Sequence, residues 1–524
     1  MAGDRIWGWG TAAGALSADE ERALLAHVGA VVPLGAPVAV PTIEEIDLAA
    51  PRLAPAGPVA SWSRTDALAR AQHTYGQAYR DLVRRLERRF ERAPDVVALP
   101  RDEAEVAASL EWADAHGAVV VPYGGGTSVV GGVEAPRDDD RPVVCLDLAR
   151  LRGVVEIDAL SRAVRCRAGT RGPALEAALE AAGLTLRHYP QSFEFSTLGG
   201  WLATHAAGHF ATGPTRIDDA VESLRALTPV GVLETGRWPS WGAGPDLRAT
   251  LLGSEGALGV ITEAWLHVSA RPTFRASAVA RFADLDAALA AARAVAQSGI
   301  RPANARVLDP LEALVAGAGD GTASLMLLAC ESADHPVDSE LARLVALVQD
   351  HGADVEAGAP VDPARRWRDA FVRAPYARDV LVRAGLLVET FETATTWDRL
   401  ATLRARLDAV VRAALAATGS PGSLVSWRLT HLYPDGAALY ATVLAPARAA
   451  DRVGQWDEVA AHALDAMVDA GAPVTHHHAV GRDHRAHFAA TSGPLGLALL
   501  AAAKATLDPH DVMNPGALLA ERDA

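Results

Sequence analysis

A loop of three consecutive glycines that directly follows a strand–helix–strand unit constrains this chain more than any other feature. Residues 94–122 carry the pattern of a strand, a capped helix and a second strand, and the loop occupies residues 122–128. Glycines lack Cβ atoms, so a ligand can approach the backbone, and successive N–H groups can form a nest for an anion. A pyrophosphate is the natural ligand of such a nest, whereas a glycine triplet standing alone is more often a tight surface turn. The loop matches neither the GxxxxGKS/T pattern nor a GxGxxG that opens a helix, which argues against nucleotide triphosphatases and Rossmann folds.

Two further glycine-containing segments support a ligand-binding interpretation of the loop. Residues 191–201 read QSFEFSTLGGW, and Ser196 or Thr197 is expected to cap a helix whose N-terminus faces a phosphate. Residues 253–261 read GSEGALGVI and lead directly into a strand. Three such elements in order within one α+β region are much more specific than any one of them.

The rest of the chain divides into regions by its patterns. Residues 94–270 are predicted to be α+β, with several glycine-rich turns. From residue 271 onward strands and helices alternate, which predicts a sheet with helices stacked on one face. Within that part, residues 423–433 and 437–444 predict a hairpin around a Pro-Asp-Gly turn.

The first 93 residues are predicted to form an arm and a helix. Residues 1–60 contain much Pro and Ala, with Trp7 and Trp9 as aromatic anchors that pin the arm to the body. Residues 64–92 predict a helix that ends in the run RRLERRF at 84–90, and such a charge run is typical of a solvated helix face. Contact of this basic face with an anionic membrane surface is the alternative.

Composition excludes several classes of protein. Hydrophobic residues make up 50% of the chain, which excludes a mostly disordered protein. The formal net charge is −15, and an acidic surface disfavours a nucleic-acid partner. Apolar runs stay shorter than the ~20 residues that span a bilayer, and no apolar segment of a signal peptide follows the first residues. With 3 cysteines, neither a disulfide framework nor a zinc site is expected, and the sequence predicts a reduced, cytoplasmic protein.

The three glycine elements together resemble the FAD-binding domain of the vanillyl-alcohol oxidase and p-cresol methylhydroxylase superfamily. The segment 507–516, LDPHDVMNPG, also resembles that superfamily's C-terminal return to the flavin domain. The resemblance implies an α+β fold in which a two-subdomain FAD-binding domain of the p-cresol methylhydroxylase type is covered by an α+β cap domain. Because no histidine lies within 117–187, we expect FAD to be held without a covalent bond. The expected boundaries are 1–93 for the arm and helix, 94–270 for the FAD-binding domain, 271–504 for the cap and 505–524 for the C-terminal return.

A string of three histidines indicates which branch of the superfamily the chain resembles. His476, His477 and His478 precede the segment AVGR at 479–482. On a strand, at most His476 and His478 would point the same way, and a metal would need ligands from elsewhere, so no metal is expected. The string resembles the HHHGVGK stretch of the alkylglycerone-phosphate synthases. Further segments that match this family are WGWG at 7–10, and 305–309, 375–379, 389–393, 397–399 and 430–433, together with Tyr440.

The resemblance implies an exchange reaction that uses flavin without net redox change. In that family, flavin N5 forms a covalent adduct at C1 of an acyl-dihydroxyacetone phosphate, the fatty acid leaves, and a fatty alcohol replaces it in ether-lipid synthesis. By position, Tyr440 resembles the family's acid/base tyrosine, and it needs nearby cations to act as a base because tyrosine titrates at about 10. Arg378 resembles the arginine that binds phosphate or carboxylate. The remaining implied catalytic positions are Arg306 beside the flavin, His188, and His476, His477 and His478 in the polar wall.

The cofactor-binding positions implied by the resemblance fall in four segments of the first region. They are Pro122, Tyr123, Gly124, Gly125, Gly126, Thr127, Ser128, Gln191, Ser192, Phe193, Glu194, Phe195, Ser196, Thr197, Thr204, His205, Ala206, Ala207, Glu255, Gly256, Ala257, Leu258, Gly259, Val260 and Ile261.

This chain departs from the family pattern at several positions. Arg482 stands for the lysine after the histidines, Ala479 for a glycine, and His205 for an arginine after Thr204. The ending Asn-Pro-Gly at 514–516 is common in superfamily members that oxidise 2-hydroxy acids. An FAD-dependent dehydrogenase or oxidase of lactate or glycolate is therefore the alternative, and a flavin-binding scaffold is the non-enzymatic one. The expected partner is a small-molecule or lipid substrate and no nucleic acid, with peripheral membrane contact and a homodimer left open.

Overall fold

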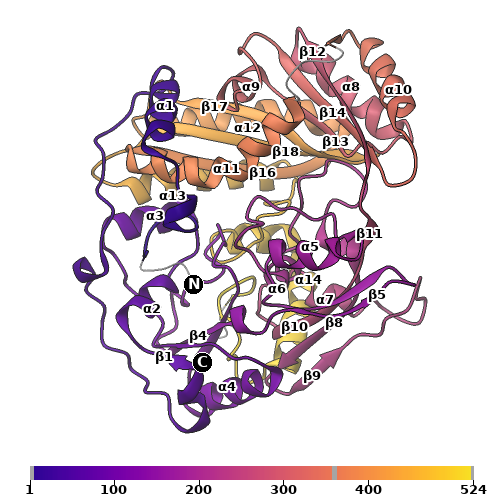
Figure 1. Ribbon diagram of the computed structural model, residues 1–524. Coiled ribbons are helices and arrows are strands. Elements are labelled where there is room, and N and C mark those ends of the chain that lie inside the picture. Colours follow the sequence, from indigo (N-terminus) through magenta and orange to yellow (C-terminus); the bar gives the residue numbers. More distant parts are fainter. Residues whose placement is uncertain (1–4, 357–362, 521–524) are drawn as a thin grey trace.

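The computed structural model describes residues 5–356 and 363–520 and shows two lobes, with the N-terminal arm running along one side of both (Figure 1). The lower lobe holds two sheets. The first has the order β1 (Ser63–Arg64), β2 (Val96–Ala98), β4 (Val143–Asp147) and β3 (Val119–Tyr123). The second is antiparallel, in the order β5 (Val154–Asp158), β6 (Ala163–Arg167), β10 (Val260–His267), β8 (Val221–Thr228) and β9 (Gly231–Glu234).

Short helices and one small ribbon complete the lower lobe. Asp102 caps α4 by accepting a hydrogen bond from the backbone N–H of Glu105 at 2.9 Å, and Gly117 ends the turn that follows with φ +61°. The elements are α4 (Glu103–Ala115), α5 (Gly172–Glu180), α6 (Leu198–Ala203), α7 (Arg248–Leu251) and the pair β7 (Leu184–Thr185) and β11 (Ser269–Ala270). The strand–helix–strand unit predicted for residues 94–122 is therefore confirmed.

The glycine loop lies where β3 ends. Strands β2, β4 and β3 run parallel, so their carboxyl ends meet at one edge of the sheet, which is where open α/β sheets bind ligands. The C-terminal segment returns to this place and lies beside β3. Val120 accepts a hydrogen bond from the N–H of Asn514 at 2.8 Å and donates one to the carbonyl of Val512 at 2.7 Å.

The upper lobe is built on one antiparallel sheet of seven strands. Its order is β15 (Asp354–Glu356), β12 (Phe274–Phe282), β14 (Ser324–Ser332), β13 (Asn304–Leu308), β17 (Leu424–Leu432), β18 (Gly436–Pro446) and β16 (Leu386–Thr396). The hairpin predicted at 423–444 is confirmed as β17 and β18. Strand β16, which pairs with β18 along eleven positions, was not predicted from the sequence.

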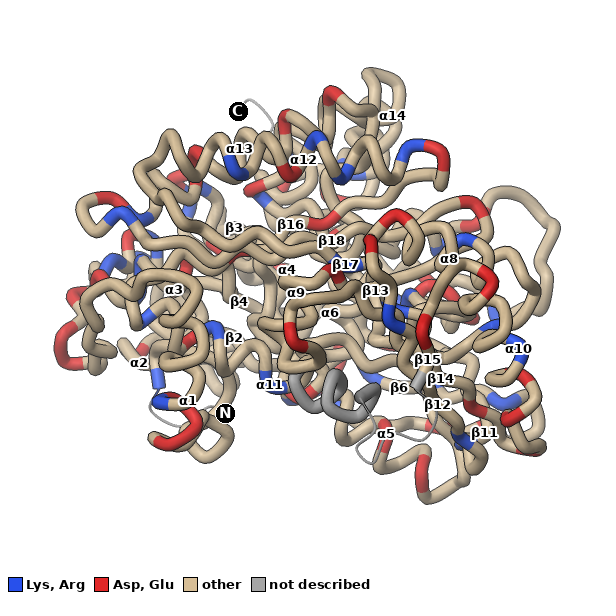
Figure 2. The backbone as a smooth tube through the Cα atoms, turned by 90° about the horizontal axis from the view of Figure 1, so that it is seen from above, with Lys and Arg blue, Asp and Glu red and all other residues tan. Residues whose placement is uncertain are grey.

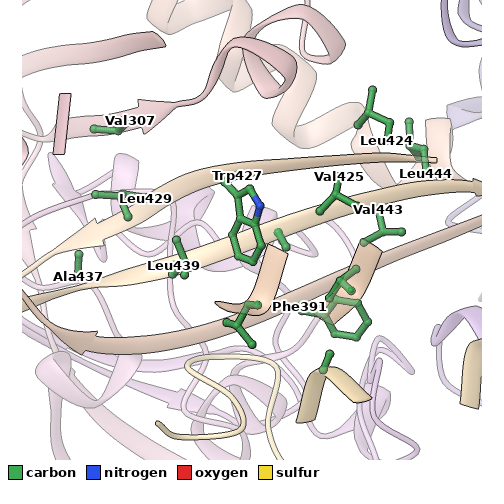
Figure 3. Close-up of a cluster of buried hydrophobic side chains, with 14 of the residues drawn as sticks. Val307, Phe391, Leu424, Val425, Trp427, Leu429, Ala437, Leu439, Val443 and Leu444 are labelled. Carbon is green, nitrogen blue, oxygen red and sulfur yellow. The ribbon is translucent and has the colours of Figure 1, made fainter. Parts of the chain in front are cut away.

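The apolar face of this sheet forms the core of the upper lobe. Figure 3 shows Val425, Trp427, Leu429, Leu439 and Val443 in that core, all at odd-numbered positions of β17 and β18. Because strand side chains alternate, Arg428 on β17 and Tyr440 and Thr442 on β18 face the other way, toward the cavity between the lobes. The helices of the upper lobe are α8 (Leu285–Gln297), α9 (Pro310–Val315), α10 (Asp338–Gln349), α11 (Pro363–Arg383), α12 (Trp397–Ala417) and α13 (Arg452–Asp469).

The N-terminal arm is pinned down as the sequence predicts. Trp7 and Trp9 are 3% and 7% exposed. The Nε1 of Trp7 donates to the carbonyl of Leu82 at 2.9 Å, and the ring of Trp9 meets Phe195 edge-on with centroids 5.5 Å apart. The arm also carries α1 (Ala18–Gly29), whose first turn is closed by a capping box.

The helix predicted at 64–92 is two helices, α2 (Ala67–Gln72) and α3 (Tyr79–Leu86), and the basic run at 84–90 is a solvated face only beyond the end of α3. Arg84 and Arg85 are 6% and 3% exposed, so the prediction is wrong for them, whereas the side chains of Arg88 and Arg89 are 35% and 46% exposed. Arg84 donates to Asp81 and Glu134 at 2.6 Å each, while Arg85 donates to two backbone carbonyls at 2.7 and 2.9 Å. These two cations are paired inside the protein, whereas Arg88 and Arg89 pair with the carboxylates of Glu45, Glu87 and Glu91 at the surface.

Helix α14 (Arg485–Leu507) is a long, apolar and largely exposed element. Its length and its mean hydropathy of 1.3 would suit a membrane span, and it is the one helix of which this holds within the described ranges. Gly493, with φ 69°, and Pro494 break its helical geometry, so two pieces meet at a kink. Leu495 and Leu499 are 87% and 72% exposed, and Figure 2 shows the helix at the edge of the molecule.

Candidate active site

One cavity of about 800 Å³ lies where the two lobes meet. Its wall combines the glycine loop of the lower lobe, the polar face of the upper sheet, α11 and the N-terminal arm. Segments more than 400 residues apart in sequence thus contribute to one space, as the predicted covering of a flavin domain by a cap requires.

The glycine loop forms an open cradle at one end of this cavity. A Cβ atom on Gly125 would lie 2.1 Å from the carbonyl oxygen of Phe195, and one on Gly124 would lie 2.2 Å from Thr197 Oγ1. Gly126 has φ +66°, a conformation that favours glycine. The N–H groups of Gly125, Gly126 and Thr127 meet no acceptor within residues 5–356 and 363–520. This cradle therefore fits the pyrophosphate of FAD, which would occupy those donors.

The second glycine element begins α6 but is not capped as predicted. Thr197 is the N-cap residue of α6, yet its side chain makes no capping hydrogen bond. Ser196 Oγ instead donates to the carbonyl of Ser192 at 2.8 Å and accepts from Trp201 Nε1 at 2.6 Å. Both Ser196 and Thr197 still line the cavity.

Most of the predicted cofactor positions line the cavity, and six do not. Those that line it are Pro122, Tyr123, Gly124, Gly125, Gly126, Thr127, Ser128, Gln191, Ser192, Ser196, Thr197, Thr204, Ala206, Ala207, Glu255, Gly256, Gly259, Val260 and Ile261. Phe193, Glu194, Phe195, His205, Ala257 and Leu258 lie outside the lining. Among these, His205 points to Asp218, with Nδ1 2.8 Å from the carboxylate.

Tyr440 lies on the polar face of the upper sheet and lines the cavity opposite the cradle. Its neighbours along β18 on this face are Thr442 and Leu444, which also line the cavity. The guanidinium of Arg428, on β17, lies 3.8 Å from the centre of the Tyr440 ring. Burial raises the pKa of Tyr440 above its ordinary value, and the charge of Arg428 opposes that rise.

The three histidines lie in a loop rather than on a strand, so the prediction that only two of them converge is wrong. Glu392 Oε1 accepts hydrogen bonds from the backbone N–H groups of His476, His477 and His478 at 3.1, 2.8 and 2.6 Å. The hydroxyl of Thr475 donates to the same oxygen at 2.7 Å, and His477 Nδ1 contacts the other oxygen. Burial opposes the negative charge of Glu392, but these histidines hold its pKa well below the usual range.

Burial favours the neutral form of His476 and His478. Burial lowers the pKa of His476 to about 3 and that of His478 to about 4. His477 and His478 line the cavity, whereas His476 lies behind them and bonds to the hydroxyl of Tyr433 at 2.8 Å. His431, His476 and His477 bring ring nitrogens within 4.8 Å of one another, and the expectation of no metal here stays a prediction.

Arginines approach the cavity from both the sheet and α11. Arg306, on β13, is 1% exposed and donates to the carbonyl of His209 at 3.3 Å. Burial and the nearby charge of Arg428 lower the pKa of Arg306 to about 9. Arg378, on α11, lines the cavity and donates to the carbonyl of Gln77.

His188 is not brought to the cavity wall. It is 5% exposed, and its ring packs edge-on against Trp201 with centroids 5.0 Å apart. Burial lowers the pKa of His188 to about 3. Its geometry is that of a buried aromatic neighbour beneath α6, and its assigned catalytic role stays a prediction.

Comparison with known proteins identifies the family. Residues 94–236 match the model of an FAD binding domain, and residues 271–518 match that of the C-terminal domain of FAD linked oxidases. An alkyldihydroxyacetonephosphate synthase of Dictyostelium discoideum is 30% identical over 482 residues, which cover 87% of this chain and 78% of that protein. This chain belongs to the alkyldihydroxyacetonephosphate synthase family. The name is a synonym of alkylglycerone-phosphate synthase, so the predicted family is confirmed, and FAD is the cofactor.

Solved structures agree with this assignment. An alkyldihydroxyacetonephosphate synthase superposes with a TM-score of 0.82 at 26% identity, covering 98% of this chain and 97% of that chain. p-Cresol methylhydroxylase, at 14% identity and a TM-score of 0.71, covers 88% and 95% of the two chains and shares the fold. The predicted fold class is therefore confirmed. A glycolate oxidase subunit of Bacillus subtilis is a more distant relative, 24% identical over 82% of this chain and 90% of that protein.

The cavity lining of this member of the synthase family also includes nine apolar side chains, which are called the apolar arm. They come from α1 and the residues before it, from α9 and its end, from α11 and from the sheet. They are Leu16, Ala23, Leu24, Val28, Val315, Ala316, Leu381, Val388 and Leu444. The same cavity therefore offers polar groups that suit anions and apolar side chains that suit a hydrocarbon chain.

The departures from the alkyldihydroxyacetonephosphate synthase pattern cluster at a junction of the two lobes. Ala479 has φ 73°, the left-handed conformation that glycine would adopt without strain, so alanine is disfavoured there by about 1–2 kcal/mol. Arg482 donates to the carbonyls of Gly131 and Pro515 at 3.0 and 2.9 Å and to the side chain of Asn514 at 2.8 Å. The forked guanidinium can reach all three acceptors, which an ammonium on a lysine stem reaches less well.

Two carboxylates hold this site together: Glu392, which was not predicted as a site residue, and Glu255, which was predicted only as a cofactor-binding residue. Glu392 fixes the histidine loop, and Glu255 accepts from the backbone N–H groups of Val480 and Gly481 at 2.8 and 2.7 Å. Burial raises the pKa of Glu255 to about 7. Each carboxylate accepts hydrogen bonds from backbone N–H groups more than 80 residues away. The spacing of residues in the sequence therefore could not indicate these hydrogen bonds.

Proposed function

We propose that this chain exchanges the acyl group of an acyl-dihydroxyacetone phosphate for a fatty alcohol, giving an alkyl-dihydroxyacetone phosphate and a free fatty acid. One observation supports this proposal more strongly than any other. A single cavity joins a pyrophosphate cradle, a wall of tyrosine, arginine and histidine, and an apolar arm. Oxidation of a small 2-hydroxy acid needs no such arm, so the lipid reaction accounts for more of the cavity.

Each polar group of the wall has a role in this reaction. The phenol oxygen of Tyr440 takes a proton from C1 of the substrate and returns it when the ether is complete. Arg378 and Arg306 bind the phosphate and the departing carboxylate, which are both anions. His477 and His478, whose backbone N–H groups are held by Glu392, orient the substrate oxygens. Bound FAD supplies the isoalloxazine ring that activates the substrate carbon without net oxidation or reduction.

The chain supports this chemistry by its division into lobes. We assign residues 94–270, with the return at 505–524, to the flavin lobe and residues 271–504 to the cap. The arm and helix at 1–93 close one side, since Trp9 lines the cavity. FAD is held in this arrangement without a covalent bond.

An exchange assay tests the function directly. Holoenzyme incubated with palmitoyl-dihydroxyacetone phosphate and radiolabelled palmitate is expected to move label into the substrate, and added hexadecanol is expected to yield the ether product. The flavin spectrum recorded in the same samples discriminates the alternative. If D-lactate or glycolate bleaches the flavin under anaerobic conditions and no exchange occurs, the protein is a 2-hydroxy acid dehydrogenase instead.

The place of action is proposed to be the cytoplasmic periphery of a membrane, with α14 as the contact. Residues 488–503 of α14 carry no charged side chain, and Leu495 and Leu499 are 87% and 72% exposed. Such a face gains free energy by entering the apolar boundary of a bilayer.

Vesicle sedimentation tests this contact. The native protein is expected to bind neutral phosphatidylcholine vesicles, and Leu495→Ser with Leu499→Ser is expected to weaken binding by about tenfold or more through lost apolar burial. Leu160→Ser, at a residue 97% exposed in the turn between β5 and β6, is the matched control. If the native protein ignores vesicles and the double variant converts a dimer to a monomer, a second copy of the chain covers the helix instead.

A further inference from the structure

Tyr440 occupies the middle of one row of residues across three strands. In the pairing of β16 with β18 it lies opposite Glu392, and in the pairing of β17 with β18 it lies opposite Arg428. Directly opposed residues of an antiparallel pair point to the same face of the sheet. The sheet therefore places a carboxylate on one side of the phenol and a guanidinium on the other.

The guanidinium of Arg428 is fixed against the phenol ring. It lies 3.8 Å from the ring centre, which is the stacked geometry of a cation on an aromatic face. Arg428 Nη1 also contacts Glu312 Oε1 and lies 3.3 Å from Thr442 Oγ1. The side chains of Arg428 and Glu312 are 10% and 4% exposed, so water screens neither charge well. Glu312 is itself held by the hydroxyl of Ser426, which donates to it at 2.6 Å.

Other polar groups surround the phenol, but none matches this contact in proximity and charge. Glu392 is already engaged by the backbone of the histidine loop, and the rings of His477 and His478 lie with centroids 6.1 and 5.7 Å from that of Tyr440. Burial keeps the pKa of His478 low, so its ring contributes little positive charge. The groups that face or interact with Tyr440 from the elements around it are Arg428, Glu312, Glu392, Thr390, His477 and His478, together with the more remote charge of Arg306 on β13.

We propose that Arg428 is the positioning residue that sets the protonation state of Tyr440, and that Glu312 adjusts its effect in the opposite direction. Arg428 stabilises the phenolate through its charge over the ring. Glu312 offsets part of that charge. The ion pair of Arg428 and Glu312 therefore determines the proton affinity of Tyr440. The catalytic consequence rests on the proposed exchange function, whereas the titration of the phenol does not.

With Arg428 at its ring, the buried Tyr440 can act as the base that removes the proton from C1 of the substrate. When the C–H bond at C1 of the substrate breaks, its proton passes to the phenolate oxygen of Tyr440, and the electron pair stays on the substrate. No oxidant or reductant is consumed. Burial alone raises the pKa of Tyr440 and makes its phenolate scarce, and a cation fixed at the ring restores part of it.

Nuclear magnetic resonance of tyrosine labelled with 13C at Cζ tests the proposal without any substrate. The chain has 7 tyrosines, and the resonance of Tyr440 is the one that disappears in Tyr440→Phe. In FAD-loaded Arg428→Gln, the titration of Tyr440 is expected to move upward by about one to three pH units, as loss of a unit charge at this distance predicts. In Glu312→Gln it is expected to move downward. Arg428→Lys, which keeps the charge without the planar stack, is expected to lie between the native protein and Arg428→Gln.

The same variants give a second readout in the exchange assay. The acid side of the pH–rate profile is expected to shift upward in Arg428→Gln, so that activity at fixed pH falls about 10- to 1,000-fold and recovers as the pH rises. In Glu312→Gln the profile is expected to shift downward. Flavin content and the melting temperature of each variant show whether it is folded. If only one variant folds, the direction in which its pH–rate profile shifts is enough to test the proposal.

Opposite shifts of the two variants support the assignment. Equal losses of activity at every pH, or a Tyr440 titration unchanged in Arg428→Gln, would overturn it and leave Arg428 a structural residue. If the titration shifts as expected while no exchange occurs in the native protein, the inference about the phenol stands and the proposed function fails. If exchange occurs without any shift, the function stands and this inference fails.

Discussion

The Gly125→Val protein is expected to purify without FAD. Any Cβ at position 125 would lie 2.1 Å from the carbonyl oxygen of Phe195, and backbone on both sides leaves no flexible side chain to move away. The loop must therefore shift away from residues 195–197, which takes its N–H groups out of hydrogen-bonding reach of the pyrophosphate. Gly125→Ala introduces the smaller clash, and an overpacking energy of about 1–3 kcal/mol predicts affinity weakened by about 5- to 150-fold. The ratio of bound flavin to protein, read from the visible absorbance, measures FAD binding in both variants.

Gly242→Val is the matched control for this experiment. Gly242 is exposed, and a Cβ there would meet nothing within 4 Å. This variant is expected to retain FAD at the native ratio. Retention of FAD by Gly125→Val, with an unchanged melting temperature, would contradict the assignment of the cradle to the pyrophosphate.

Tyr440→Phe is expected to lower the rate of acyl exchange by about 10²–10⁴-fold, the usual contribution of a positioned acid or base. The change removes one oxygen from a residue that is 4% exposed and lines the cavity, while the ring keeps its packing under Arg428. FAD content and melting temperature are therefore expected to stay near native. Initial rates of label exchange at saturating substrate give the effect on kcat.

Tyr433→Phe serves as the control for a lost hydroxyl in the same hairpin. Tyr433 does not line the cavity, and its hydroxyl bonds to His476 at 2.8 Å and to Thr215 at 3.2 Å. We expect the exchange rate to fall by about tenfold or less, because the change removes only hydrogen bonds that lie behind the wall. Equal losses in the two variants would mean that Tyr440 acts through structure rather than proton transfer.

The sequence predicted those parts of the fold that local patterns encode. The strand–helix–strand unit before the glycine loop carries its own cap at Asp102 and its own stop at Gly117, so neighbouring residues suffice to define it. Strand β16 lacks such a signal, because Glu389 and Glu392 interrupt its apolar positions. Their partners, Trp456 and the histidine loop, lie 67 and more than 80 residues away.

The same limit explains the errors in the candidate site. The basic run at Arg84 has the pattern of a solvated helix face, yet its partner Glu134 lies 50 residues further along the chain. Three adjacent histidines suggested a strand, whereas the carboxylate of Glu392 gathers their backbone into a loop. Residue types could be predicted for the wall, but which of them face the cavity depends on the pairing of distant strands.

Segments far apart in the order of synthesis complete the cofactor chamber. Trp9 lines it, and Asn514 donates to the carbonyls of Gly132 and Glu255 beside it at 3.1 and 2.7 Å. The segment around Asn514 leaves the ribosome after every residue that lines the chamber. A nascent chain stalled before this segment emerges is therefore expected to stay colourless, because its chamber is still incomplete.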